Sequence, residues 1–150
     1  MSGHVDPVLG QSLGDALARG RQRALSTRQP VLVSVASPLP DIADIVPLWE
    51  AAEGSPYRAL WGRPDQGFWM VGLGQALSLG VDSGRLSPRA QDWHRRWLDS
   101  AVIAAPDLPG VGPTCFSAFR FDPDGPADEE WRSLCAGALV LPRLTFARGA

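Results

Sequence analysis

Two short apolar segments and the loop between them decide the fold. Residues 58–71 read Arg58-Ala59-Leu60-Trp61, then Gly62-Arg63-Pro64-Asp65-Gln66, then Gly67-Phe68-Trp69-Met70-Val71. Aromatic and β-branched residues favour a strand on each side. The loop between them has the length and the Gly, Pro and Asp content of a hairpin turn. We therefore expect an antiparallel hairpin at this place.

Two longer helices are expected, one before and one after this hairpin. Apolar residues recur about every 3.6 residues from Val8 to Ala24, a spacing typical of an amphipathic helix. Ser87-Pro88 supplies an N-cap and a first helical residue for the second helix. The apolar stripe of the second helix consists of Leu86, Ala90, Trp93, Trp97 and Ala101. Each stripe predicts that one face of its helix is buried.

Three shorter helical segments are also expected. Pro47 favours a short helix that ends at Gly54. Residues Gln75 to Leu79 are expected to form one or two helical turns ended by Gly80. A further helical turn is expected from Glu129 to Leu134.

Alternation of apolar residues predicts three strands besides the hairpin. They are Val31 to Val35, Thr114 to Phe121, and Ala138 to Phe146. Pro142 interrupts the last of them, which argues for an edge position or a bulge. The order of helix, strand, hairpin, helix, strand and strand predicts an α+β fold with mainly antiparallel strands and flanking helices.

The composition is that of a globular domain. The chain has 150 residues, of which 45% are hydrophobic and 20% charged, enough for one domain with a core. No uninterrupted apolar run approaches ~18 residues. Met1 to Asp6 lack the basic and apolar regions of a secretory signal, so we expect a cytoplasmic protein. A net charge of −2 predicts neither a nucleic-acid partner nor a membrane partner.

The types of charged and sulfur-containing residues exclude several chemistries. All 14 basic residues are arginines, which excludes a lysine base, a Schiff-base lysine and a P-loop lysine. Cys115 and Cys135 stand twenty positions apart and form no zinc-binding spacing with His4 or His94. We expect two buried thiols, in or beside strands. His94 is expected on the flank of its helix.

Two glycine-containing motifs are rejected as ligand sites. Val71-Gly72-Leu73-Gly74 resembles a dinucleotide loop, but Leu77 stands where the third glycine is needed. These glycines instead predict a tight turn that passes close to a packed neighbour. Asp122 and Asp124 begin like a calcium loop, but the ligands that should follow are missing. The residues alone therefore assign no catalytic, binding or metal site.

Tryptophan is unusually frequent in this sequence, which has six. The helical spacing places Trp93 and Trp97 in the core. Four others, Trp49, Trp61, Trp69 and Trp131, need apolar cover that a small two-layer fold supplies only with difficulty. They suggest surface that is buried against another part.

Several segments, in order along the chain, carry a family resemblance. They are Pro30 to Ser34, Leu60 to Pro64 with Phe68, Val71 to Ala76, and Phe116 to Pro123, followed by Trp131 and by Ala138 to Leu144. In this order and spacing they resemble the amino-terminal part of isochorismate synthases, which are chorismate-utilising enzymes. The resemblance covers about residues 30–146. It departs at Ser117 and Ala118, where the family usually has glycines.

The resemblance implies an α/β sandwich in which strands from two halves of the enzyme share sheets. Residues 1–29 would be an amino-terminal helix and linker. Residues 30–150 would be the amino-terminal portion of the sandwich, with the carboxyl-terminal catalytic half absent. The family isomerises chorismate to isochorismate with Mg²⁺, for menaquinone or siderophore synthesis.

The family's reactive residues are a lysine that activates water, a glutamate that protonates the departing hydroxyl, and glutamates that hold the metal. All belong to the carboxyl-terminal half, so no residue of this chain takes a catalytic, binding or metal role, and Mg²⁺ would bind outside it. The expected partners are that half, on the same or a separate polypeptide, and chorismate. The isolated chain is expected to be an inactive fragment that tends to aggregate.

Two alternatives stay open. The same portion could belong to an anthranilate or salicylate synthase, because this half does not carry the specificity of the reaction. The chain could also be a non-catalytic binding or interaction module on the same scaffold. A third hypothesis is a pocket between Trp61, Trp69 and the helix that contains Trp93.

Overall fold

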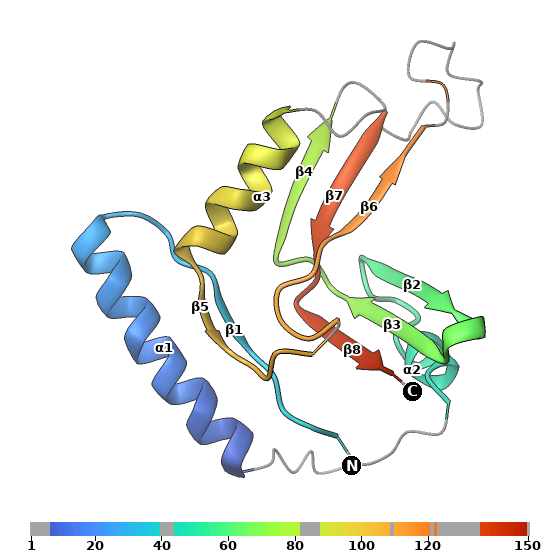
Figure 1. Ribbon diagram of the computed structural model, residues 1–150, viewed down its shortest axis with the longest axis horizontal. Helices are drawn as coiled ribbons and strands as arrows, with labels where there is room; N and C mark the ends of the chain where they lie inside the picture. Colours follow the sequence, from blue (N-terminus) through green and yellow to red (C-terminus); the bar gives the residue numbers. More distant parts are fainter. Residues whose placement is uncertain are drawn as a thin grey trace. The chain divides into compact units, whose positions relative to one another are not determined.

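The computed structural model describes residues 7–39, 44–81, 88–108, 110–120, 122 and 136–149. The chain divides into two compact units, Met1–Ile42 with Arg95–Pro113, and Ala43–His94 with Thr114–Ala150. The described strands form three sheets (Figure 1). Within the described ranges, no helix is long and apolar enough to cross a membrane.

The first unit packs one helix on a two-stranded parallel sheet. Helix α1 spans Pro7–Thr27, and strands β1 (Val33–Val35) and β5 (Val102–Ala104) pair in parallel. Ala16 is fully buried on the inner face of the helix. A Cβ added at Gly20 would lie 2.5 Å from Cγ2 of Val33, so this glycine lets helix and strand approach closely.

This unit confirms the predicted first helix and the strand after it, but Leu13, Leu17 and Leu25 of the expected apolar stripe are exposed. It also contains β5, which the sequence does not predict, because the apolar stripe of the second helix extends to Ala101. Helix α3 ends at Ser100 and β5 begins two residues later. A strand of three residues is too short to show an alternating pattern.

The second unit contains two antiparallel sheets of three strands each. The first sheet has the order β2-β3-β8, with β2 at Arg58–Arg63, β3 at Phe68–Leu73 and β8 at Leu144–Arg148. A 3-10 turn at Pro64–Gln66 and Gly67 in the left-handed conformation close the β2–β3 hairpin. The predicted hairpin is therefore confirmed. The short predicted helix is also confirmed, as α2 at Val46–Ala51 with proline in its first turn.

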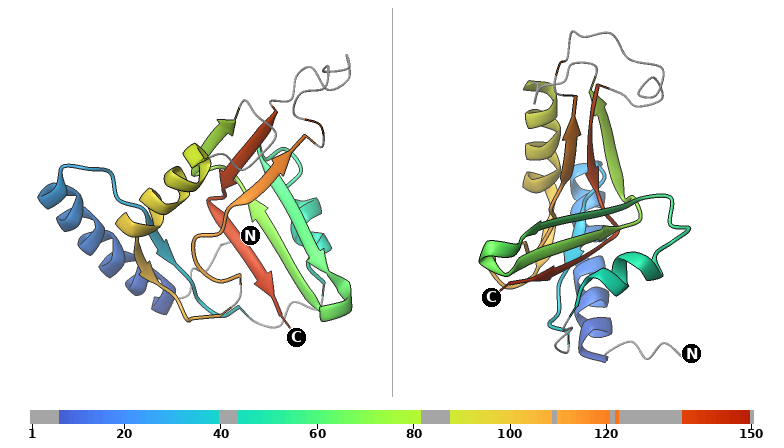
Figure 2. Two further views of the ribbon diagram at one scale, coloured as in Figure 1. Left: turned by 45° about the horizontal axis from the view of Figure 1, so that its top comes forward. Right: turned by 90° about the vertical axis from the view of Figure 1, so that its right-hand side faces the viewer.

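The second sheet of this unit has one face covered by a helix. Its order is β4-β7-β6, with β4 at Leu77–Val81, β7 at Gly137–Leu141 and β6 at Phe116–Phe119. Helix α3 spans Pro88–Ser100, and its residues 88–94, which belong to this unit, lie on one side of these strands (Figure 2). The hydrophobic cluster between them consists of Val81, Ala90, Leu139, Leu79, Trp93 and Phe119. The predicted core position of Trp93 is confirmed.

Two predictions in this sheet are wrong. Residues Gln75 to Leu79 do not form helical turns, because residues 77–81 pair with 137–141 as strand β4. The single strand expected from Ala138 to Phe146 is two strands, β7 and β8, which lie in different sheets with Pro142 between them. Both errors have one cause: the partner strand is distant in the sequence, and local patterns do not show it.

Some predictions fall on residues that the structure does not describe. These are the N-cap at Ser87, the helical turn from Glu129 to Leu134, Trp131, Cys135, His4 and most of the turn after Asp122. The described part nevertheless confirms the α+β class, with mainly antiparallel strands and flanking helices.

Truncation of the core should reveal where the second unit gains its stability. Leu139 is 3% exposed in the cluster under α3, so Leu139→Ala is expected to lower the free energy of unfolding by about 2–5 kcal/mol. Leu144 is 58% exposed, and Leu144→Ala is the matched control, expected to cost far less. Urea unfolding followed by tryptophan fluorescence measures both. Equal losses for the two variants would contradict this account of the core.

Candidate functional site

The two sheets of the second unit meet at a bend where two neighbouring strands change sheet together. Strand β3 continues into β4 through residues 74–76, and β7 continues into β8 through residues 142–143 (Figure 1). Leu73 pairs with Leu144 on one side, and Leu77 pairs with Leu141 on the other. Three residues therefore lie opposite two, as in a β-bulge, which turns strands out of a sheet plane. We call these five residues the bend.

Backbone hydrogen bonds hold the bend together. The backbone N–H of Arg143 donates to the carbonyl oxygens of Leu73 and Gly74, at 3.1 and 3.3 Å. The backbone N–H of Ala76 donates to the carbonyl oxygen of Leu141 at 2.9 Å. The ladder therefore continues through the change of sheet, and the interruption is local.

Side chains add two further contacts at the bend. Nε of Arg143 donates to the carbonyl oxygen of Gln75 at 3.0 Å. Nε2 of Gln75 donates to Oγ of Ser78 at 2.7 Å. The backbone N–H of Gly74 donates to the carbonyl oxygen of Tyr57 at 2.8 Å, which ties the bend to the residue before β2.

Two glycines allow the close packing of the bend. A Cβ added at Gly72 would lie 2.6 Å from Cγ of Pro142 and 2.7 Å from the Phe116 ring, closer than real contacts allow. Gly74 has φ +63, a conformation that side chains other than glycine rarely adopt. The predicted tight turn beside a packed neighbour is confirmed at this place.

Segments that carry the family resemblance converge here. Residues 71–76 and 138–144 contain the two sides of the bend, and Phe116 packs against Gly72. Ser117 and Ala118, where the family usually has glycines, are exposed. The departure at these two positions therefore disturbs no buried packing among the described residues.

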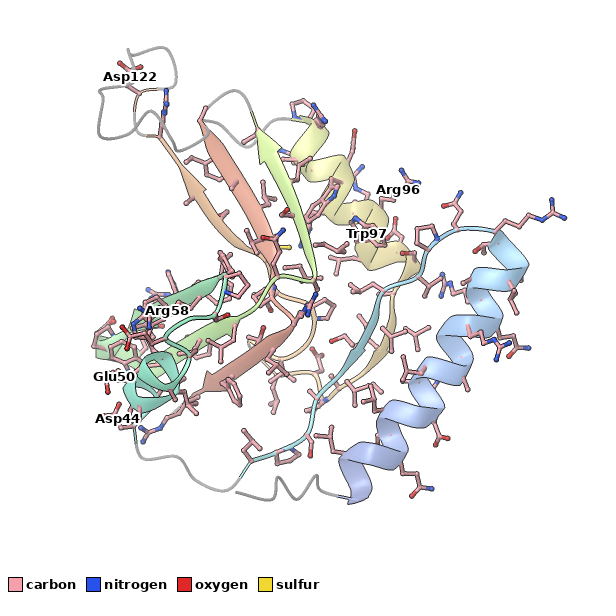
Figure 3. All side chains as sticks on the ribbon, turned by 180° about the vertical axis from the view of Figure 1, so that it is seen from behind. Asp44, Glu50, Arg58, Arg96, Trp97 and Asp122 are labelled. Carbon is pink, nitrogen blue, oxygen red and sulfur yellow. The ribbon has the colours of Figure 1, made fainter. Side chains whose placement is uncertain are left out.

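The hairpin and α2 position the tryptophans of this unit. The ring of Trp61 packs edge-to-face on Phe68, with 5.8 Å between centroids, yet Trp61 is 48% exposed. The guanidinium of Arg58 lies 4.6 Å from the centroid of Trp49 and donates to the carbonyl oxygen of that residue at 3.1 Å. Figure 3 shows Arg58 beside α2. The expected shortage of apolar cover is therefore real for Trp61, whereas Arg58 partly covers Trp49.

The pKa values of two groups near the bend, Cys115 and Tyr57, are raised, which makes both groups less reactive. Burial raises the pKa of the Cys115 thiol above its ordinary value of 9.0. Burial also raises the pKa of Tyr57, and the charge of Cys115 raises it further. A catalytic thiol needs a lowered pKa. Cys115 is a free thiol beside β6, so its predicted place beside a strand is confirmed, but it is only half-buried and not buried as expected. His94 is half-buried on α3.

Around the bend, the described residues supply hydrogen-bond donors and close packing rather than reactive side chains. Among them, no group of three or more His, Cys, Asp or Glu side chains could hold a metal ion. Sequence reasoning missed Arg143 as a donor at the bend. Its signal is an arginine that directly follows a proline inside an apolar strand pattern.

A family model and a curated protein both match this chain, and both concern chorismate enzymes. The family model described as chorismate binding enzyme matches residues 19–150. The curated salicylate biosynthesis isochorismate synthase of Pseudomonas aeruginosa is 29% identical over 132 residues, which are 87% of this chain and 26% of the relative. The chain thus spans about a quarter of the length of this relative. No solved structure matches the chain.

A methyl group at Gly72, beside the bend, should be costly, and one elsewhere in the same unit should not. Gly72→Ala is expected to lower the free energy of unfolding by about 1–3 kcal/mol, because Pro142 and Phe116 must move. Gly80 in β4 has nothing within 4 Å of an added Cβ, so Gly80→Ala is expected to be neutral or to stabilise by up to about 1 kcal/mol. Urea unfolding of both variants checks this, and a neutral Gly72→Ala would disprove the close packing.

The raised pKa of Cys115 predicts slow alkylation and a loss of stability at alkaline pH. The folded thiol ionises less readily than the unfolded thiol, so stability should fall as pH rises above about 9. In a Cys135→Ser variant, iodoacetamide should react with Cys115 more slowly in the folded chain than in concentrated urea at the same pH. Faster reaction in the folded chain would contradict the burial of this thiol.

Proposed function

The chain belongs to the chorismate binding enzyme family, and on this premise we propose that it is the amino-terminal portion of an isochorismate synthase. The complete enzyme would isomerise chorismate to isochorismate. The relative from Pseudomonas aeruginosa supports this reaction, since it is named as an isochorismate synthase of salicylate biosynthesis. The observation that carries the proposal is that the region matched in this relative is only 26% of its length.

The outer strands of the two sheets in the second unit support the proposal that a catalytic part completes them. Each has three strands among the described residues, so β2 and β8 are the outer strands of one sheet and β4 and β6 of the other. Neither β4 nor β6 contains a charged residue. Natural proteins protect exposed edges with charges, prolines or covering segments. We propose that strands of the catalytic part cover these edges.

The catalytic residues of the proposed enzyme lie outside this chain. The family resemblance implies a lysine that activates water and a glutamate that protonates the departing hydroxyl, and this chain has no lysine. The family resemblance implies that glutamates of the catalytic part hold the metal, so we also place the Mg²⁺ site there. Magnesium there would neutralise the carboxylates of the substrate.

This chain would therefore contribute shape and not reactive groups. Its part would be to complete the sandwich that holds the catalytic part in its active form. The proposal places the reaction in the cytoplasm, with isochorismate used for menaquinone or siderophore synthesis.

The proposal predicts an inactive chain that gains activity only with its partner. The DNA downstream of Ala150 should encode a lysine- and glutamate-bearing catalytic part, in the same frame or in a neighbouring gene. Co-expressed with that part, the chain should co-purify with it and convert chorismate to isochorismate when Mg²⁺ is present. The purified chain alone, with chorismate and Mg²⁺, should form no isochorismate.

Each other outcome of this experiment has a definite meaning. Isochorismate formed by the chain alone would contradict the proposal. Anthranilate or salicylate formed by the complex would assign a sibling enzyme of the same family. A stop codon with no partner gene would favour the non-catalytic module.

A further inference from the structure

The shorter side of the bend contains only one backbone donor. Pro142 has no N–H, so the backbone N–H of Arg143 is the only one between Leu141 and Leu144. That single group lies within hydrogen-bond distance of two carbonyl oxygens, those of Leu73 and Gly74. The backbone N–H of Arg143 is therefore the one main-chain donor that this side contributes across the bend.

The side chain of Arg143 forms a hydrogen bond with the next carbonyl oxygen along the chain. Nε of Arg143 donates to the carbonyl oxygen of Gln75. The aliphatic part of the side chain lies over Gly74, where an added Cβ would be 3.5–3.6 Å from Cβ, Cγ and Cδ of Arg143. Arg143 thus donates to three consecutive carbonyl oxygens, 73 to 75, at the point where the strands change sheet.

Arginine is well suited to this position. Its Nε–H directly follows a stem of three carbons and belongs to a planar guanidinium. Lysine has a methylene group at the same place and its donor one bond further out. A lysine keeps the charge of Arg143 but cannot place a donor at the same point.

Two outer strands, β4 and β8, begin directly after the bend. Strand β4 starts directly after Ala76, and strand β8 starts directly after Arg143. They are outer strands of different sheets. The angle at the bend therefore decides how the two edges are presented together.

We propose that Arg143 is a positioning residue that fixes this angle, so that the catalytic part can engage the edges of β4 and β8 at the same time. The inference rests on the proposed function. The role proposed for Arg143 differs from a charge contact with the catalytic part, because it depends on the hydrogen-bond donor at Nε and not on the positive charge.

The test uses the complex of the full chain with the catalytic part encoded downstream. Arg143→Met keeps the stem and removes the donors, and Arg143→Lys keeps the charge without a donor at the Nε position. The matched control is Arg89→Met, at an exposed arginine on α3 in the same unit. For each complex we would measure the dissociation constant, hydrogen exchange of the amides at 76 and 143, kcat per assembled complex, and the unfolding temperature.

Both Arg143 variants should show a weakened bend and weaker assembly. Loss of one hydrogen bond predicts about three- to tenfold faster exchange at the two amides and a similar rise in the dissociation constant. The kcat per assembled complex should stay unchanged, and Arg89→Met should change none of these quantities. If Arg143→Met does not fold, the dissociation constant and the hydrogen exchange of the Arg143→Lys complex alone test the inference.

The remaining outcomes would overturn the inference. Full assembly of Arg143→Lys with weak assembly of Arg143→Met would show a charge contact instead. Unchanged exchange or unchanged assembly in both variants would remove the role of Arg143 and leave the proposed function intact. If the unmodified chain does not bind the catalytic part, the proposed function fails and this inference fails with it.

Discussion

The second unit depends on one constraint, which is that two strands must leave one sheet and enter another without losing their pairing. Three residues on one side and two on the other absorb the turn, and the ladder resumes on both sides with a one-residue shift. Gly72 lets Phe116 and Pro142 lie against the backbone, and Gly74 supplies the left-handed conformation. Because β3 and β7 are the central strands of their sheets, every described strand of this unit either continues through the bend or pairs with one that does.

Local signals in the sequence predicted much of the fold. The hairpin followed from Pro64, Gly67 and the apolar residues around them, and α3 followed from the spacing of Ala90, Trp93 and Trp97. Strand β4 was mistaken for helical turns, because only its pairing with β7, some sixty residues later, makes residues 77–81 a strand. The sequence could not show that Pro142 separates two sheets, since that depends on contacts distant along the chain.

The candidate site was predictable only in part, for the same reason. Glycines at 72 and 74 indicated a tight turn beside a packed neighbour, and the structure identifies the neighbours as Phe116 and Pro142. The local pattern shows an arginine directly after a proline in an apolar strand, but it does not show that Arg143 donates to the segment at 73–75. The family resemblance contained this information indirectly, because its two separate motifs are the two sides of one bend. The division expected after residue 29 stays a prediction.

The pairing of distant segments also affects the order in which this protein can form during synthesis. Strand β1 pairs with β5, β3 with β8, and β4 and β6 with β7, and each partner is separated by a long stretch of chain apart from the β6–β7 pair. On the ribosome, the β2–β3 hairpin can form early, but β4 and the second edge of β3 must wait for residues 137–148. During that interval apolar strands are without their native neighbours, which favours capture by chaperones or wrong pairing with other chains. The topology therefore makes the nascent chain vulnerable until its central strand β7 has emerged.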